Sequence, residues 1–205
     1  KDKKTMKLKR KKHDFSNVPK ADIQRSSFNR SHGHKTTFDA GLLIPVYVDE
    51  ALPGDTFKMN ASVFARMATP LAPVMDNATM SIHFFSVPKR LLWDNFEKFM
   101  GAQENPGDST DFLVPQVDFS SLAVGEQTIS DYIGLPLGYA GRANAWWHRA
   151  YNMIWNEWYR DQNLQDAVAV EKGDGPDTAS TYSLLKRGKR HDYFTSCLPF
   201  PQKGP

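Results

Sequence analysis

Three strand-like segments follow one another in the first half of the chain with no helical segment between them. They are residues 42–49, 56–64 and 79–87, and proline or glycine lies close to each. The last is the clearest, because every second residue from Met80 to Phe84 is apolar. Parallel strands need long crossover connections, so short connections favour antiparallel pairing. The sequence therefore favours an all-β sandwich over a doubly wound α/β fold.

These strands are too few to close a sandwich, which needs about seven. After Pro88 the apolar period changes, and it predicts helices over residues 91–100, with Gly101 as terminator, and over residues 142–160. In the second helix the pattern predicts an apolar face and a polar face. The apolar face comprises Ala143, Trp147, Ala150, Tyr151, Ile154 and Trp158, and the polar face His148, Arg149, Asn152, Asn156 and Arg160. We therefore expect the chain to be the front portion of a larger domain.

The charge of the chain is divided unevenly between its two ends. The 205 residues carry a net charge of +3, but residues 1–35 hold twelve basic and three acidic side chains and sum to +9. The remainder holds fourteen basic and twenty acidic side chains and sums to −6. Since 40% of the residues are hydrophobic, the body can form a core and is not disordered throughout. The sequence thus predicts an extended basic arm on a mildly acidic body.

The first twelve residues are the candidate nucleic-acid-binding segment. Their positive charge can neutralise phosphates through counterion release, and no apolar face accompanies it as membrane insertion would require. A solubilising or processing tail is the alternative. No aromatic residue precedes Phe15, so we expect contacts to the nucleic-acid backbone rather than to bases. The candidate residues are Lys1, Lys3, Lys4, Lys7, Lys9, Arg10, Lys11 and Lys12.

The helix over residues 142–160 is rich in tryptophan. Its aromatic residues follow the helical repeat, which favours packing in the core or at a subunit interface. The alternative is a stacking platform for single-stranded bases beside Arg149 and Arg160. A further short basic patch occupies residues 186–190. The residues assigned to core or interface are Trp146, Trp147, Tyr151, Trp155 and Trp158.

Signals for catalysis, metal binding and membrane insertion are weak or absent. Cys197 is the only cysteine, and the histidines at 13, 32 and 34 lack the spacing of a zinc site. The acidic residues at 171, 174 and 177 do not fit a calcium-binding loop. The only argument for a catalytic triad of His191, Asp192 and Ser196 or Cys197 is that these residues lie close together in the sequence. We therefore expect no enzyme, cofactor, metal site or transmembrane helix.

Several segments together resemble a known family. They are RSSFNRSHGHKTTFDAG (residues 25–41), ALPGDTF (51–57), ARMATP (65–70), FFSVPKRLLWDN (84–95), RAYNMIWNEWYRDQN (149–163) and KRHDYFTSCLPFPQKGP (189–205). In this order they resemble the major capsid protein of the small icosahedral single-stranded DNA phages, the Microviridae, and within them the gokushovirus branch. The resemblance covers nearly all of the chain, and only the first dozen residues match loosely.

The resemblance implies a mainly β fold, a viral jelly-roll sandwich with large helical and loop insertions that is incomplete in this chain. Residues 1–35 would be the arm, 36–88 the first jelly-roll strands, and 89–205 insertions leading back toward the sandwich. The implied function is self-assembly into a T=1 shell around circular single-stranded DNA. Implied partners are copies of the chain, packaged DNA and other virion or scaffolding proteins, in a virion assembled in the bacterial cytoplasm. The competing hypothesis is a non-specific single-stranded nucleic-acid-binding module that uses the arm and the tryptophan helix.

Overall fold

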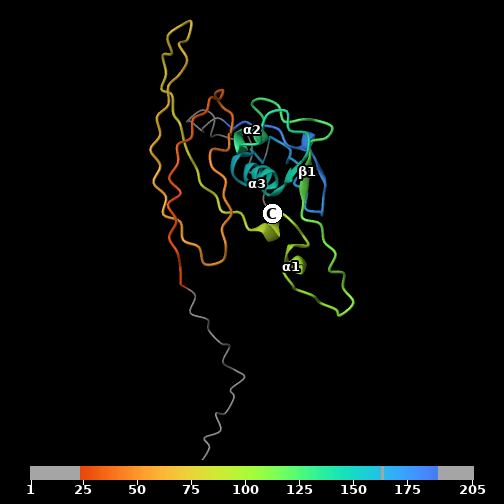
Figure 1. Ribbon diagram of the computed structural model, residues 1–205. Helices are drawn as coiled ribbons and strands as arrows, with labels where there is room; N and C mark the ends of the chain where they lie inside the picture. Colours follow the sequence, from red (N-terminus) through yellow and green to blue (C-terminus); the bar gives the residue numbers. More distant parts are fainter. Residues whose placement is uncertain (1–23, 163, 189–205) are drawn as a thin grey trace, which may run out of the picture. The chain divides into compact units, whose positions relative to one another are not determined.

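The structure is a computed structural model that describes residues 24–162 and 164–188. The chain divides into two units, Lys1–His34 and Lys35–Pro205. In the first unit the described residues are exposed, and the Asn29 side chain accepts hydrogen bonds from the backbone and hydroxyl of Ser31. The helices and strands of the described residues all lie in the second unit (Figure 1). Their order is η1 (Lys89–Leu91), α1 (Phe96–Phe99), β1 (Gln116–Asp118), α2 (Ile129–Ile133), β2 (Arg142–Asn144), α3 (Trp146–Ile154), η2 (Trp155–Tyr159), β3 (Asp177–Thr178) and η3 (Ala179–Thr181).

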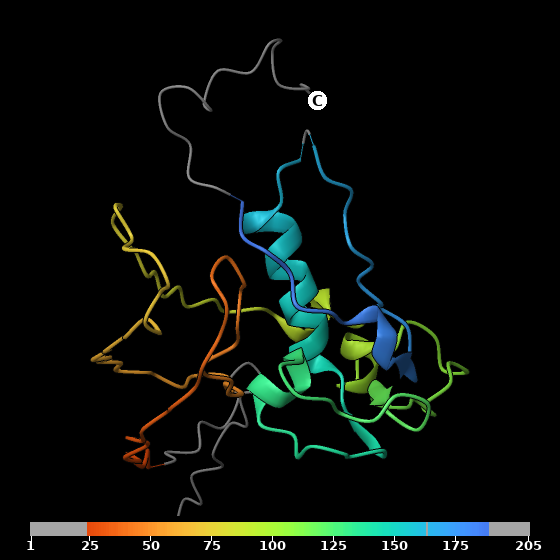
Figure 2. The same ribbon diagram turned by 90° about the horizontal axis from the view of Figure 1, so that it is seen from above.

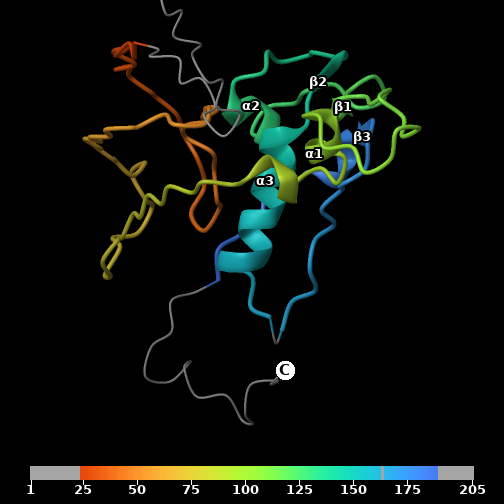
Figure 3. The same cartoon turned by 90° about the horizontal axis from the view of Figure 1, so that it is seen from below.

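A small mixed sheet lies beside α3 (Figure 3). The central strand, β1, pairs antiparallel with β2, with Val117 opposite Ala143, and parallel with β3. Backbone hydrogen bonds from Phe119 to Gly141 and from Ala145 to Pro115 continue the β1–β2 ladder beyond both strand ends. The described strands of this sheet have only two or three residues each, so the sheet is too small to be stable alone. Its stability depends on the elements that pack against it.

Local sequence signals define α2, which lies in the connection from β1 to β2. The Thr128 side chain accepts a hydrogen bond from the Asp131 backbone, and the Asp131 carboxylate accepts one from the Gln127 backbone. This reciprocal arrangement is related to a capping box. Gly134 ends the helix at φ 106°, a left-handed conformation that a residue with a Cβ rarely adopts.

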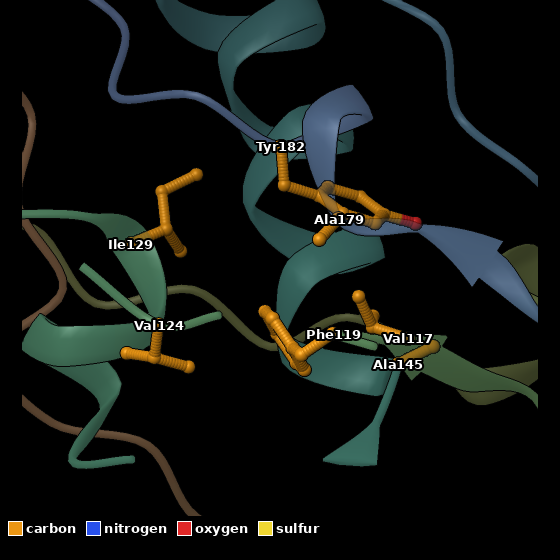
Figure 4. Close-up of a cluster of buried hydrophobic side chains, with 7 residues drawn as sticks. All are labelled: Val117, Phe119, Val124, Ile129, Ala145, Ala179 and Tyr182. Atoms are coloured by element: carbon orange, nitrogen blue, oxygen red, sulfur yellow. The ribbon is translucent and has the colours of Figure 1, made fainter. Parts of the chain in front are cut away.

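The main core lies between the sheet, α2 and η3 (Figure 4). The largest apolar contributions come from Val117 and Phe119 on and after β1 and from Ile129 on α2, and all three are buried. A second cluster joins Trp93 and Leu92, after η1, to Trp146 at the start of α3. Full burial of one such side chain contributes about 1.5–3 kcal/mol, so both clusters stabilise this part of the fold.

The helix predicted over residues 142–160 exists, but its buried face is not the predicted one. Residues 142–144 form β2, and the helical part runs from Trp146 through α3 and η2 to Tyr159. His148, Arg149 and Asn152, all predicted on the polar face, are about 1% exposed or less. Trp158, predicted on the apolar face, is 71% exposed. The prediction was wrong because the three buried polar side chains have partners that a helical repeat does not reveal.

Arg149 is the most important of these buried polar residues. Its guanidinium binds the Asp177 carboxylate with two hydrogen bonds of 2.7 and 2.6 Å and donates a third, of 2.8 Å, to the Leu92 carbonyl. The Tyr182 hydroxyl donates to the same carboxylate at 2.6 Å. Burial and this hydrogen bond raise the pKa of Tyr182, so its hydroxyl stays protonated and keeps donating. Through Arg149, α3 is joined to β3 and to the residue after η1.

His148 is buried on the same helix without a charged partner in hydrogen-bond contact. Its Nε2 atom lies 2.9 Å from the Ser130 hydroxyl on α2. Its Nδ1 atom has no hydrogen bond of standard geometry among the described residues. The Asn144 carbonyl interacts with the imidazole electrostatically and favours its protonated form. Burial lowers the pKa of His148 from 6.5 to about 4, while the Asn144 carbonyl and the Asp177 carboxylate partly oppose this shift. The imidazole is therefore neutral near pH 7.

The predicted strands at residues 42–49, 56–64 and 79–87 are not paired into a sheet in the described part of the chain. Only one antiparallel bridge, between Leu42 and Lys186, involves them. They run instead as long open segments (Figure 1). A strand requires a hydrogen-bonded neighbour, and the described residues supply none for most of this length.

The helix predicted over residues 91–100 is broken into η1 and α1. The interruption follows Trp93, whose backbone still donates to the Lys89 carbonyl in the helical pattern, and begins at Asp94, where contacts with residues 172–174 take over. The Asp94 backbone donates to the Lys172 carbonyl, and the Trp93 indole donates to Asp174. Gly101, the expected terminator, does follow the end of α1 and has φ 104°. Among the described residues no helix has the length and apolarity needed to cross a bilayer.

Replacing Arg149 with Met should destabilise the fold by about 3–5 kcal/mol, because it leaves the Asp177 carboxylate buried without a counter-charge. Urea denaturation followed by tryptophan fluorescence measures this change. Arg142→Met is the matched control: its pair with Asp118 is exposed, with 3.3 Å between the atoms, so little change is expected. Equal effects of the two substitutions would contradict the role given to Arg149.

Acidification should weaken the fold through His148. Because its pKa is lower in the folded chain than the ordinary 6.5, its contribution is complete above about pH 6.5 and falls as the pH approaches 4. The expected loss by pH 4 is about 3 kcal/mol. Urea denaturation of the natural chain and of His148→Gln across this range isolates the effect. The natural chain should lose more stability than the variant, and parallel pH profiles would contradict this assignment.

Candidate functional site

The candidate nucleic-acid-binding residues 1–12 lie outside the described residues, as do His191, Asp192, Ser196 and Cys197. Among the residues that the structure describes, no group of three or more His, Cys, Asp or Glu side chains could hold a metal ion. Asp174 accepts hydrogen bonds from Trp93 and Asn95, and Asp177 is bound by Arg149. The acidic residues at 174 and 177 therefore serve the packing of the loop near β3.

The five aromatic residues assigned to core or interface occupy three different environments. Trp146 and Trp155 are buried, and the Trp155 indole donates a 3.0 Å hydrogen bond to the Lys186 carbonyl. Trp147 and Tyr151 are half-buried, and only Trp158 is exposed. Core packing accounts for Trp146 and Trp155, whereas Trp158 remains available for contact with another molecule.

Tyr151 connects α3 to two segments far apart in the sequence. Its hydroxyl donates a 2.7 Å hydrogen bond to the Leu43 carbonyl and accepts a 2.9 Å bond from the Leu185 backbone. Burial raises the pKa of Tyr151 to about 12, with the Leu185 N–H opposing the shift, so the hydroxyl remains a donor. Leu43 also bonds to Leu185 directly, backbone to backbone, at 2.9 Å. The segment ending at Gly188 is therefore held along α3 and η2 (Figure 2).

An aromatic cluster lies at the end of η2. It comprises His83, Phe85, Trp158 and Tyr159, and we call it the terminal ring cluster. Phe85 contacts Trp158 with ring centroids 5.5 Å apart and Tyr159 with centroids 6.0 Å apart. The Tyr159 hydroxyl lies 2.6 Å from the His83 Nδ1 atom. The Arg187 guanidinium lies 5.9 Å from the centre of the Tyr159 ring.

Sequence reasoning identified only part of this cluster. It named Trp158 and the basic patch at residues 186–190, but not His83, Phe85 or Tyr159. The contact between His83 and Tyr159 joins residues 76 positions apart, so no spacing rule reveals it. The nearest signal is the alternation around residue 84, which places His83 and Phe85 on one face of an extended segment.

Apolar side chains are exposed along the open segment that precedes η1. Phe64 is 91% exposed and Met75 is 94% exposed. Exposed apolar side chains that gather into large patches mark sites of association, and this segment exposes many of them. The exposed apolar residues of the segment are Phe57, Met59, Val63, Phe64, Met67, Leu71, Val74, Met75, Met80 and Phe84.

Comparison with known proteins identifies a family and several relatives of the chain. A family model described as "Capsid protein (F protein)" matches residues 16–205. The chain is 51% identical over 193 residues to the capsid protein VP1 of Bdellovibrio phage phiMH2K, covering 94% of this chain and 36% of that protein. It is 45% identical over 216 residues to the capsid protein VP1 of Chlamydia phage 1, covering 95% of this chain and 36% of that protein.

A third relative is more distant but is matched over a similar range. The capsid protein VP1 of Spiroplasma virus 4 is 34% identical over 215 residues, covering 98% of this chain and 39% of that protein. The chain thus spans little more than a third of the length of these relatives. The family match covers nearly the whole chain, and the chain belongs to the F-type capsid protein family of phages.

Proposed function

We propose that this chain is a portion of a structural major capsid protein. The complete protein self-assembles into a small T=1 icosahedral shell around circular single-stranded DNA, within a virion assembled in the bacterial cytoplasm. Copies of itself, packaged DNA and other virion or scaffolding proteins are its partners. The observation that carries the proposal is the exposed apolar surface between Phe57 and Phe84, in a chain that belongs to a capsid family.

The fold of the complete protein is proposed to be a jelly-roll sandwich. Residues 42–49, 56–64 and 79–87 would be its first strands, and later segments of the polypeptide would supply their neighbours. Two properties support this proposal: the three segments are rich in apolar residues and belong to no sheet of the described chain, and the curated relatives are almost three times as long as the matched region. Residues 89–205, which include the sheet and α3, would then form helical and loop insertions that lead back toward the sandwich.

The proposed role of the basic arm is to attract the packaged DNA. Eight Lys or Arg residues within the first twelve positions provide a charge that phosphates can neutralise without sequence preference. The body of the chain is acidic overall, so electrostatic attraction to DNA is concentrated in the arm. Shell closure would depend on burial of apolar surface, which does not require DNA.

Deletion of residues 1–12 in the full-length protein should therefore reduce packaged DNA while shells still form. Particle yield from sucrose gradients and the ratio of absorbance at 260 and 280 nm provide the two readings. A deletion of the exposed loop residues 103–105 is the matched control and should leave DNA content unchanged. Complete loss of particles in the arm deletion would contradict this division of roles.

Assembly should cover the exposed apolar segment. In a Cys197→Ser background, Phe64→Cys should react with a maleimide at least about tenfold more slowly in assembled particles than Gln103→Cys, since apolar surface is buried on association. Both positions are exposed in the described chain, which makes them comparable. Peptide mass spectrometry gives the labelling rates. Equal labelling at the two positions in closed particles would contradict the proposal.

A further inference from the structure

The rings of His83 and Tyr159 form an aromatic surface of two nearly parallel rings. Their planes differ by only 6°, and their edges are joined by the 2.6 Å contact between Nδ1 and the hydroxyl oxygen. Both of these atoms lie in the planes of their rings, so the two planes cannot be separated by more than 2.6 Å. Stacked rings need about 3.4 Å between planes, set by carbon–carbon contact distances. The two rings therefore lie side by side, and neither covers the face of the other.

The terminal ring cluster is open to solvent next to this surface. His83 is exposed, and Trp158 is 71% exposed. Phe85 stands almost perpendicular to both flat rings, at 78° to His83 and 76° to Tyr159, and braces them by its edge. A rigid aromatic surface held in this way can accept another flat ring without first being rearranged.

Positive charge is fixed beside the rings. The Arg187 backbone donates a 2.8 Å hydrogen bond to the Gly41 carbonyl, and the Lys186 carbonyl accepts one from Trp155. The ion pairs of the described residues do not involve Lys186 or Arg187. Lys186 and Arg187 thus contribute two positive charges, while Glu157 in η2 and Asp161 just after it are acidic.

We propose that the terminal ring cluster, together with Lys186 and Arg187, forms a binding site for single-stranded nucleic acid. Bases stack on the exposed rings of His83 and Trp158, and phosphates contact the two cations, as in sites that bind single strands without sequence preference. The inference rests on the proposed function, since it assigns a base-contacting surface to the packaged DNA. The arm has no aromatic residue before Phe15, so base contacts require a separate surface of this kind.

Two other occupants fit the surface less well. The buried centre of a protein–protein interface is depleted of lysine, whereas this surface is flanked by a run of Lys and Arg. Duplex DNA presents phosphates but keeps its bases stacked inside the helix, so it cannot use the exposed rings. Single strands alone use both the rings and the charges.

The test measures binding of the unassembled full-length protein to fluorescein-labelled oligo(dT) of roughly 20 nucleotides, and to the duplex of that strand with oligo(dA). Trp158→Leu removes a ring on which a base stacks, so it should weaken single-strand binding about tenfold. Duplex binding uses only the surface charge, so it should stay within about twofold. Trp158→Phe keeps a ring and should retain most of the affinity. Lys186→Gln with Arg187→Gln should weaken both, and should reduce the log–log salt slope for the single strand by up to about 1.4.

Phe38→Leu is the matched control, because it removes another exposed ring outside the cluster. His83→Ala removes a second ring of the cluster, and it should change single-strand and duplex binding as Trp158→Leu does. Equal weakening of single-strand and duplex binding, or no weakening, would overturn the inference. Normal binding with failed assembly would also overturn it, because the cluster would then be a subunit contact.

The arm deletion separates this inference from the proposed function. If removal of residues 1–12 abolishes DNA binding while Trp158→Leu and His83→Ala have no effect, the inference fails and the proposed function stands. If the unaltered protein binds no single-stranded DNA, and its particles contain none, both fail.

Discussion

The buried pair of Arg149 and Asp177 is the interaction on which the rest of the structure depends. β3 contributes only two residues to the sheet, so its ladder with β1 is too short to hold it. Arg149 supplies the missing attachment by binding Asp177 from α3, and its remaining hydrogen bond fixes the chain after η1. A charged group buried so deeply requires all of its partners in one arrangement, which favours a single packing of helix, sheet and loop.

Helical periodicity predicted where α3 lies but not which way it faces. His148, Arg149 and Asn152 were assigned to solvent because polar side chains are usually exposed. Their partners are Ser130, Asp177 and the Ala169 carbonyl, which belong to other elements of the fold. Burial of a polar group is acceptable when it is hydrogen-bonded, and a local pattern contains no information about distant partners. Tryptophan occurs on both faces of the helix. This was the only local feature of the sequence to indicate that neither face is entirely polar.

The candidate surfaces differ in how far sequence could predict them. Charge alone identified the arm and the run at residues 186–190, since clustered Lys and Arg need no tertiary partner to be recognised. Alternation identified the apolar segments, but it could not show which residues pair with them, because strand pairing joins residues far apart in the sequence. The terminal ring cluster could not be predicted, because the edge-to-edge contact of His83 and Tyr159 forms only when the open segment returns to the end of η2.

The order of the two charged partners along the chain has a consequence for folding during synthesis. Arg149 precedes Asp177 by 28 positions, and a ribosome adds about 5–20 residues each second. For at least a second or so, therefore, the nascent helix carries a guanidinium whose counter-ion does not yet exist. The helix must stay hydrated during this interval, because burying the cation alone is strongly unfavourable. The core can close only after β3 has been made, which protects the emerging chain from premature collapse around an unpaired charge.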